Sequence, residues 1–325
     1  MNSAPSIAGR RPKIHEKPHR VAYFALIAVC FFWGTTYLGI RIALESFPPL
    51  YLIAIRYVIS GAILLAAAAL SGARLPRGRE LFYTAVCGTI CIGIGNGCLA
   101  ISEEWIPSGL AALFYTTAPF LMVGIDAVLP GGKRPQLSTL GGLLFGLCGV
   151  VYLVLPAASH EGLSGRTFSG FLILQLSGIG WVLGSLLQKR VRTQAQPFVN
   201  GAVQQLAAGT AMFVPAAFFE KFPHAISLRS ELAIAYLVVF GSIIGFSSFI
   251  YSMARLPVAI VSIYTFVNPV VAVLLGWFFF REPFGYREAA AMLIIFAGIA
   301  LVRWSEAAVR TPISAPAPDE VGAIE

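Results

Sequence analysis

Charged side chains are scarce in this chain. Only 12% of its 325 residues are Asp, Glu, Lys or Arg, about half the share of a soluble domain. Hydrophobic residues make up 57%, and the mean hydropathy is +0.78. This balance excludes an ordinary soluble protein and indicates a polytopic membrane protein that resides in a lipid bilayer. The net charge of +8 then has to be read connection by connection, and no nucleic-acid partner is expected.

The sequence also lacks the patterns of metal sites and enzymes. It contains no HExxH motif, no GxSxG motif and no pair of carboxylates within an apolar run. The cysteines lie in apolar runs without zinc-ligand or CxxC spacing. They are Cys30, Cys87, Cys91, Cys98 and Cys148. We therefore expect no metal, no cofactor and no enzymatic activity; an intramembrane enzyme is the alternative.

Long uncharged runs are what the sequence has instead. A bilayer core about 30 Å thick requires roughly 20 apolar residues per helix, and ten runs approach or exceed this length. They predict an all-α polytopic protein with ten transmembrane helices. The first run is too long for a secretory signal and is expected to be retained. The runs are 21–40, 50–73, 81–101, 106–129, 137–159, 167–187, 198–219, 232–254, 256–280 and 289–302.

The basic residues predict the orientation. With the N-terminus inside, 16 of the 23 Lys and Arg residues fall in inner segments and six in outer ones. Inner connections of membrane proteins carry the excess of Lys and Arg. We therefore expect a multi-pass protein of the plasma membrane, the inner membrane of a bacterium, with both termini in the cytoplasm.

Two proline-containing stretches recur along the chain. Pro107 and Pro119 are twelve residues apart, and so are Pro257 and Pro269, 150 residues later. Further matches have nearly the same offset: Trp33 with Trp181, Pro49 with Pro197, Arg56 with Gln204, Gly61 with Gly209, and Gly149 with Gly298. So constant an offset predicts a duplicated chain.

The duplication defines the expected domains. The copies are residues 21–159 and 167–304, joined by a connector at 160–166. The tails, 1–20 and 305–325, lack an apolar face and are expected to be disordered and cytoplasmic.

Each copy contains five helices, an odd number, so the second copy enters the membrane from the opposite side. Two inverted five-helix repeats allow a central site to open to each side in turn. We therefore expect a secondary transporter of a small-molecule solute, a monomer or a homodimer. The alternatives are a non-transporting receptor or scaffold and a channel.

The duplicated segments resemble the EamA family of the drug/metabolite transporter superfamily. The resemblance rests on Phe32-Trp33-Gly34-Thr35, Pro49, Arg56-Tyr57, Pro107 to Leu113 with Pro119, Pro257, Asn268-Pro269 and Arg281-Glu282-Pro283. It covers nearly the whole chain except the tails. It implies ten helices in two inverted repeats and export or exchange of small metabolites such as amino acids. One departure is that the first copy reads Gly131-Gly-Lys-Arg-Pro135 where a counterpart of Glu282 would be expected.

Arg56 is the unusual charge within a predicted span. Intramembrane charges are costly and are the default functional candidates. Arg56 could attract a carboxylate, or it could be a structural anchor that reaches outward to Glu45, Glu103 or Glu104.

Aromatic and amide side chains near the middle of the spans are the other candidates for a solute cavity. For each of them, packing or helix joining is the competing interpretation. They are Trp33, Asn96, Tyr115, Trp181, Gln204, Gln205, Tyr264 and Asn268. Pro119 and Pro269 are expected to bend their helices and to free a backbone carbonyl four residues back.

Carboxylates are missing from the middle of the predicted spans. Proton-driven carriers often relay protons through such a group. If transport is coupled to protons, we expect either that Glu103 or Glu104, in the connection at the outer mouth, takes the proton or that the substrate itself carries it. Exchange and uniport are equally compatible with the sequence.

Overall fold

The structure is a computed structural model that describes residues 16–106, 111, 115–132, 134–161, 165–191, 193–280 and 285–308. Within these ranges it is helical and contains no strand. The elements are α1 (Glu16–Ala43), α2 (Pro49–Leu70), α3 (Arg79–Gly88), η1 (Thr89–Ile94), α4 (Gly95–Glu103), α6 (Ala118–Val128), α7 (Leu137–Glu161), α8 (Gly165–Arg190), α9 (Pro197–Phe219), α10 (Leu228–Tyr236), η2 (Leu237–Phe246), α11 (Ser247–Arg255), α12 (Val258–Ser262), α13 (Tyr264–Phe280) and α14 (Tyr286–Ala308).

Each of the ten predicted runs contains helix. Six helical segments are long and apolar enough to cross a membrane, and four shorter apolar helices lie in the remaining runs. The structure is thus that of a polytopic membrane protein, while ten crossings remain a prediction. α1 begins at Glu16 and α14 ends at Ala308, so helix extends into both segments that we expected to be disordered. The segment 107–110 of the proline motif lies outside the described residues.

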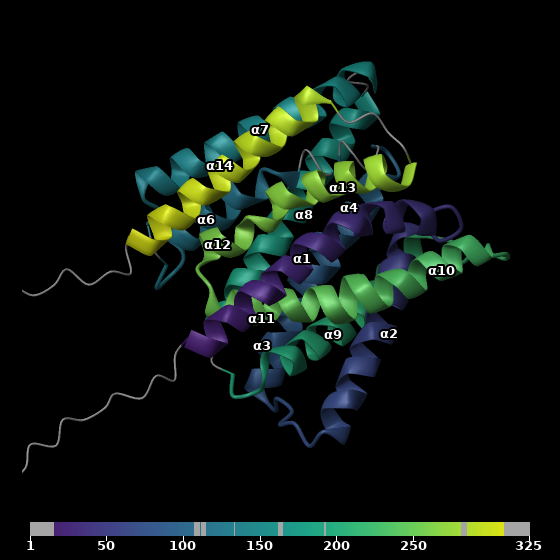
Figure 1. Ribbon diagram of the computed structural model, residues 1–325. Helices are drawn as coiled ribbons and strands as arrows, with labels where there is room; N and C mark the ends of the chain where they lie inside the picture. Colours follow the sequence, from purple (N-terminus) through teal and green to yellow (C-terminus); the bar gives the residue numbers. More distant parts are fainter. Residues whose placement is uncertain are drawn as a thin grey trace, which may run out of the picture.

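The helices form one elongated bundle (Figure 1). α1 begins and α14 ends at the same end of it, which we call the terminal end. α12 also lies near the terminal end, whereas α10 begins near the opposite end. α2 and α9 both start at a proline, where the missing N–H of the first turn costs nothing.

Two of the long helices contain a π-helical stretch. η1 separates α3 from α4, and η2 separates α10 from α11. η1 begins at Thr89 and η2 at Leu237, 148 positions further along the chain, which is the offset between Trp33 and Trp181. π-Helical turns are uncommon and frequently occur at functional sites. Periodicity gave no sign of them, because a helix that is apolar on all sides has no stripe to fix its register.

Glycines bring two helix pairs into close contact. A methyl group added at Gly61 of α2 would lie 2.5 Å from the backbone nitrogen of Leu206 of α9, and one at Gly209 would lie 2.6 Å from that of Val58. A shift of 148 positions converts Gly61 into Gly209 and Val58 into Leu206. Either contact therefore becomes the other when the two halves of the chain are exchanged.

The pair α7 and α14, side by side in Figure 1, repeats this relation. An added methyl group at Gly149 would lie 2.9 Å from the backbone nitrogen of Ile295, and one at Gly298 would lie 2.5 Å from that of Gly146. Here a shift of 149 positions exchanges the two contacts. Small residues allow such close approach of helices in a membrane.

Candidate functional site

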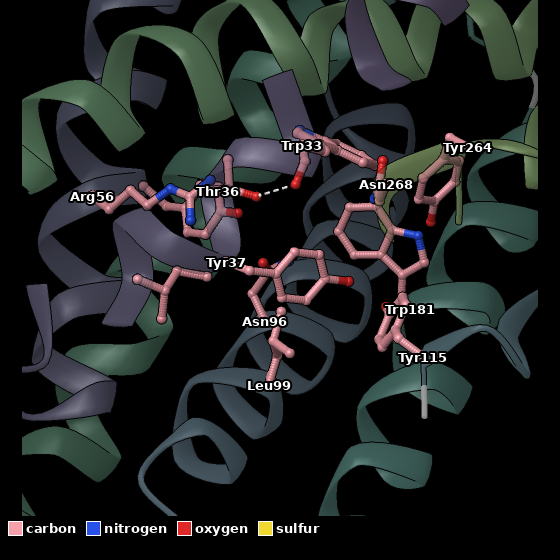
Figure 2. A pocket seen from close by; sticks show the side chains of 12 residues that line it. Trp33, Thr36, Tyr37, Arg56, Asn96, Leu99, Tyr115, Trp181, Tyr264 and Asn268 are labelled. Carbon is pink, nitrogen blue, oxygen red and sulfur yellow. Dashed lines mark hydrogen bonds between the residues drawn. The ribbon is translucent and has the colours of Figure 1, made fainter. Parts of the chain in front are cut away.

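A small internal cavity lies where α1, α2, α4, α8 and α13 meet (Figure 2). Its volume is about 40 Å³, room for only a few water molecules. The lining residues are Trp33, Thr36, Tyr37, Ile40, Arg56, Tyr57, Asn96, Leu99, Tyr115, Trp181, Tyr264 and Asn268. They come from both halves of the chain, so the cavity lies between the two predicted repeats.

Aromatic rings form one wall of the cavity. The ring centroids of Trp33 and Trp181 are 5.2 Å apart with the planes at 77°, and those of Trp33 and Tyr264 are 5.1 Å apart at 80°. Phe249 lies behind them, 5.1 Å from Trp33 and 5.2 Å from Trp181. Edge-to-face pairs of this kind contribute about 0.5–1.5 kcal/mol each beyond their buried area. We call Trp33, Trp181, Phe249 and Tyr264 the aromatic cluster.

The π-helical stretch η2 holds Trp33 in place. The indole nitrogen of Trp33 donates to the carbonyl oxygen of Gly241 at 2.9 Å. A methyl group added at Gly245 would lie 2.4 Å from the same nitrogen. Glycine is needed at position 245 because the indole ring occupies the place of a side chain. The hydrogen bond therefore fixes the ring against the backbone of η2.

Arg56 is buried beside the same stretch, with 3% of its surface exposed. Its Nε donates to Oγ of Ser242 at 2.8 Å, and its guanidinium lies 4.8 Å from the ring centroid of Tyr57. Nη1 has no hydrogen-bond partner among the described residues. A methyl group added at Gly241 would lie 2.6 Å from Nη2, so a second glycine of η2 makes room for this side chain.

Within the described residues, Arg56 interacts electrostatically with Glu103 but makes no direct ion pair with any of the three carboxylates that the anchor interpretation names. Glu45 lies 3.5 Å from Arg229 instead. Glu103 forms no ion pair with Arg56 within 4 Å, and neither of its carboxylate oxygens accepts a hydrogen bond from the described residues. Arg56 therefore carries a buried charge without a direct counter-ion in this part of the chain, an arrangement that costs several kcal/mol.

Glu103 differs from its expected place in an outer connection. It is the last residue of α4 and is fully buried. Arg41 Nη1 donates to its backbone carbonyl oxygen at 2.7 Å. The charges that act on its carboxylate are those of Arg41 and Arg56. α4 thus continues one turn past the cavity residue Leu99 and places a carboxylate beyond the cavity.

Glu104, the second coupling candidate, lies in a different environment. It is exposed, and it follows the end of α4. Partial burial raises the pKa of its carboxyl, and the negative charge of Glu220 raises it further. Glu220 accepts hydrogen bonds from the backbone nitrogens of Leu50 and Tyr51 at 2.9 and 3.0 Å, and so caps the first turn of α2.

The structure brings together seven of the nine predicted cavity residues. They are Trp33, Arg56, Asn96, Tyr115, Trp181, Tyr264 and Asn268. Gln204 and Gln205 are buried in α9 but do not line the cavity. Gln205 accepts from Ser60 and donates to the carbonyl oxygen of Ser242 at 3.4 Å, which corresponds to the helix-joining interpretation.

Asn268 and the two prolines have separate roles in the backbone. In its favourable amide orientation Asn268 donates to the carbonyl oxygens of Cys30 at 3.2 Å and Tyr264 at 2.9 Å, and so links α13 to α1. Pro269 lies inside α13, and the bend expected there stays a prediction. Pro119 instead occupies the first turn of α6, directly after a turn at Thr116 and Thr117.

Five lining residues were missed from the sequence. They are Thr36, Tyr37, Ile40, Tyr57 and Leu99. Helical spacing could have found some of them, because Thr36, Tyr37 and Ile40 follow Trp33 by three, four and seven positions and so share its face.

Two basic residues at matching positions tie the ends of the bundle. Arg41 of α1 is one turn beyond Tyr37 and donates to the backbone of Glu103, as described above. Lys189 of α8, 148 positions further, donates from Nζ to the carbonyl oxygen of Leu256 at 3.0 Å, between α11 and α12. The Lys189 contact lies beside α12, which is near the terminal end (Figure 1). Arg41 lies in the last turn of α1, a helix that begins at the terminal end and runs away from it. We call these two hydrogen bonds the two end contacts.

A second, larger cavity of about 880 Å³ lies on the side of Lys189. Its lining includes the basic residues Arg134, Lys189, Arg190 and Arg255. Asp126 also lines it and forms an ion pair with Arg190 at 2.8 Å. The cavity on this side is therefore much larger than the central one.

Comparison with known proteins agrees with this architecture. The model of the EamA-like transporter family matches the chain twice, at residues 20–155 and 168–304. A solved crystal structure superposes with a TM-score of 0.75 over 90% of this chain and 99% of that chain. At 22% sequence identity, that likeness shows the fold alone.

Curated relatives are similar over most of their length. The Escherichia coli (strain K12) protein "Uncharacterized inner membrane transporter YedA" is 35% identical over 280 residues, which cover 86% of this chain and 89% of that protein. "Protein PecM" of Dickeya dadantii is 25% identical over 286 residues, 86% and 91% of the two chains. Since the family model covers both halves of a helical, membrane-type bundle, the chain belongs to the EamA-like transporter family of the drug/metabolite transporter superfamily.

Proposed function

We propose that the protein exports a small organic metabolite, an amino acid or a related amphipathic solute, across the bacterial inner membrane by alternating access. The observation that carries the proposal is the aromatic cluster beside a small central cavity. Trp33 and Trp181 occupy matching positions of the two halves and touch each other. Residues that are equivalent by a twofold relation meet only near its axis, where a carrier with inverted repeats holds its solute.

The paired glycine contacts support two inverted repeats. In each pair, residue i of one half touches residue j of the other, and j touches i in return, which is the signature of a twofold interface. The matching positions of η1 and η2 and the double match to the family model give the same division of the chain. With the terminal end in the cytoplasm, as the basic residues favour, the Arg41 contact faces outward.

The two end contacts support alternation between two openings. Each joins the first helix of a half to the end of its third helix, one toward each face. A carrier must avoid opening both ends at once, and here both contacts are formed around a cavity that holds a few waters at most. We propose that either contact breaks when its end opens, so that this structure is an occluded form.

Purified protein in sealed vesicles tests transport itself. Vesicles loaded with one unlabelled solute from a panel of amino acids and analogues should accumulate the labelled solute by counterflow, and the flux should saturate. A channel conducts without counterflow, and a receptor or scaffold gives no flux. Cells that overproduce the protein should resist toxic analogues of the solute, since export lowers their internal concentration.

Loss of one end contact should shift the population of open forms in the opposite direction from loss of the other. Arg41→Gln should favour the outward-open form and Lys189→Gln the inward-open form, each by about 0.5–1.5 kcal/mol, a two- to tenfold change in population. Asn96→Cys in a cysteine-free background reports access to the cavity. Its labelling by a membrane-impermeant maleimide should quicken from outside in Arg41→Gln and from inside in Lys189→Gln.

The control for this experiment is Arg74→Gln, which removes an arginine whose side chain is 53% exposed and takes part in neither end contact. It should leave labelling unchanged from either side. Faster labelling from the same side in both variants would contradict the assignment of the two contacts to opposite openings.

Coupling to protons, if transport shows it, should depend on Glu103. It is the buried carboxylate beyond the cavity, whereas Glu104 is exposed to solvent. Glu103→Gln should abolish the dependence of flux on an imposed pH gradient and leave counterflow at equal pH in place. Glu104→Gln is the neighbouring control. Unchanged gradient dependence in the double variant would exclude both residues as the proton site.

A further inference from the structure

Arg56 is the single charged residue among the twelve that line the central cavity. Its Nε bonds Ser242 and its guanidinium lies against Tyr57, but Nη1 has no hydrogen-bond partner among the described residues. With 3% of its surface exposed, it has little access to water. The cavity therefore presents an N–H donor of a fixed cation, and no carboxylate belongs to its lining.

The position of the guanidinium is set by the surrounding backbone. The hydrogen bond to Ser242 fixes its plane, and Gly241 gives it space that any side chain would fill. The indole nitrogen of Trp33 donates to the carbonyl oxygen of the same glycine, Gly241. The charged group and the aromatic cluster are therefore held by adjacent residues of η2, so their separation is part of the fold.

We infer that the solute is an organic anion whose carboxylate binds Arg56 and whose apolar body lies against the aromatic cluster. This rests on the proposed function and names its substrate class. Figure 2 shows Arg56 at one end of the cavity, Trp181 and Tyr264 at the other, and the ring of Tyr37 between them. Guanidinium groups bind carboxylates in preference to neutral groups because such hydrogen bonds are assisted by charge.

The lining of the cavity contains no carboxylate that could pair with an ammonium group. Its remaining polar side chains are hydroxyls and amides: Thr36, Tyr37, Tyr57, Asn96, Tyr115, Tyr264 and Asn268, with the indole nitrogens of the two tryptophans. The carboxylate of Glu103 lies one turn beyond, under the charges of Arg41 and Arg56. The acid group is therefore the required feature of the solute, and an amino group is dispensable.

Matched ligands separate charge from shape. Binding of 3-phenylpropanoate, 3-phenylpropanamide and phenylalanine to the purified protein is measured by calorimetry, with 4-methylpentanoate and its amide as the pair with a smaller body. At least one acid should bind about tenfold or more tightly than its amide. Phenylalanine should bind no more tightly than 3-phenylpropanoate. Equal affinities for acids and amides, or no binding of either acid, would overturn the inference.

Variants of Arg56 assign the effect to its charge. Arg56→Gln should weaken acid binding about 10- to 150-fold, the range for losing a hydrogen bond to a charged group, and leave amide binding unchanged. Arg56→Lys should restore part of the preference for the acid over the amide. Lysine keeps the positive charge but lacks the paired N–H donors of the guanidinium. Arg229→Gln, at an arginine that is 67% exposed, is the control.

Two further measurements keep the outcome interpretable. If Arg56→Gln does not fold, Ser242→Ala keeps the charge and frees its orientation, and it should weaken acids more than amides. Counterflow is measured separately on the unaltered protein. Acid-selective binding without counterflow would contradict the proposed transport but uphold the carboxylate site. Counterflow of solutes that lack an acid group would uphold the proposed transport but contradict the carboxylate site.

Discussion

Trp181→Ala is expected to lower the free energy of unfolding by about 3–5 kcal/mol and to abolish counterflow. The indole ring is 4% exposed and contacts Trp33, Phe246 and Phe249. A methyl side chain would leave an apolar void in the wall of the cavity and remove the surface against which a solute body packs. Thermal unfolding in detergent and counterflow in vesicles measure the two effects.

Trp304→Ala is the matched control, because this indole on α14 is 68% exposed and faces away from the core. Its loss should change neither measurement appreciably. Trp181→Phe keeps an aromatic ring in the cluster and should recover most of the stability. If Trp304→Ala proved as destabilising as Trp181→Ala, the aromatic cluster would not be a specific source of stability.

Gly61→Ala and Gly209→Ala are each expected to destabilise the protein by about 1–3 kcal/mol. In an isolated helix the same change would stabilise by about 0.8–1 kcal/mol. The sign reverses because each added methyl group would lie within 3 Å of backbone atoms of the facing helix. Since the two contacts are exchanged by the 148-residue shift, the two losses should be similar in size.

Gly141→Ala is the control for these variants, because a methyl group at this position meets no atom within 4 Å. It should leave the unfolding temperature unchanged or raise it slightly. A large loss for Gly61→Ala with none for Gly209→Ala would argue against the twofold relation, although it would leave the family assignment intact.

Much of the cavity could be predicted from the sequence because its key residues are chemically conspicuous. Arg56 stood out as a charge in an apolar run, and the constant offset pointed to Trp33 and Trp181 as a pair. Tyr37 and Leu99 carry no charge and were not matched by the offset, so neither criterion distinguished them from other residues of their helices. In a chain that is mostly apolar, composition does not separate residues that face a cavity from those that face lipid.

Other features depend on backbone geometry that composition does not encode. The π-helical stretches change the direction of neighbouring side chains, and this decides that Gly241 and Ser242 meet Arg56. The burial of Glu103 was missed because charge was used to end the predicted span at residue 101. α4 continues instead to Glu103, where Arg41 bonds its carbonyl oxygen.

The unlike pair Arg56 and Gln204 has a directional consequence. Two repeats related by a twofold axis present equivalent surfaces to the two sides of the membrane. A solute with one acid group, by contrast, has a charged end and an apolar end. Arg56 lies at the cavity, whereas its counterpart Gln204 is packed against Gly88 in a helix contact. A bound anion would therefore keep a single orientation while the openings alternate, without turning over in the membrane.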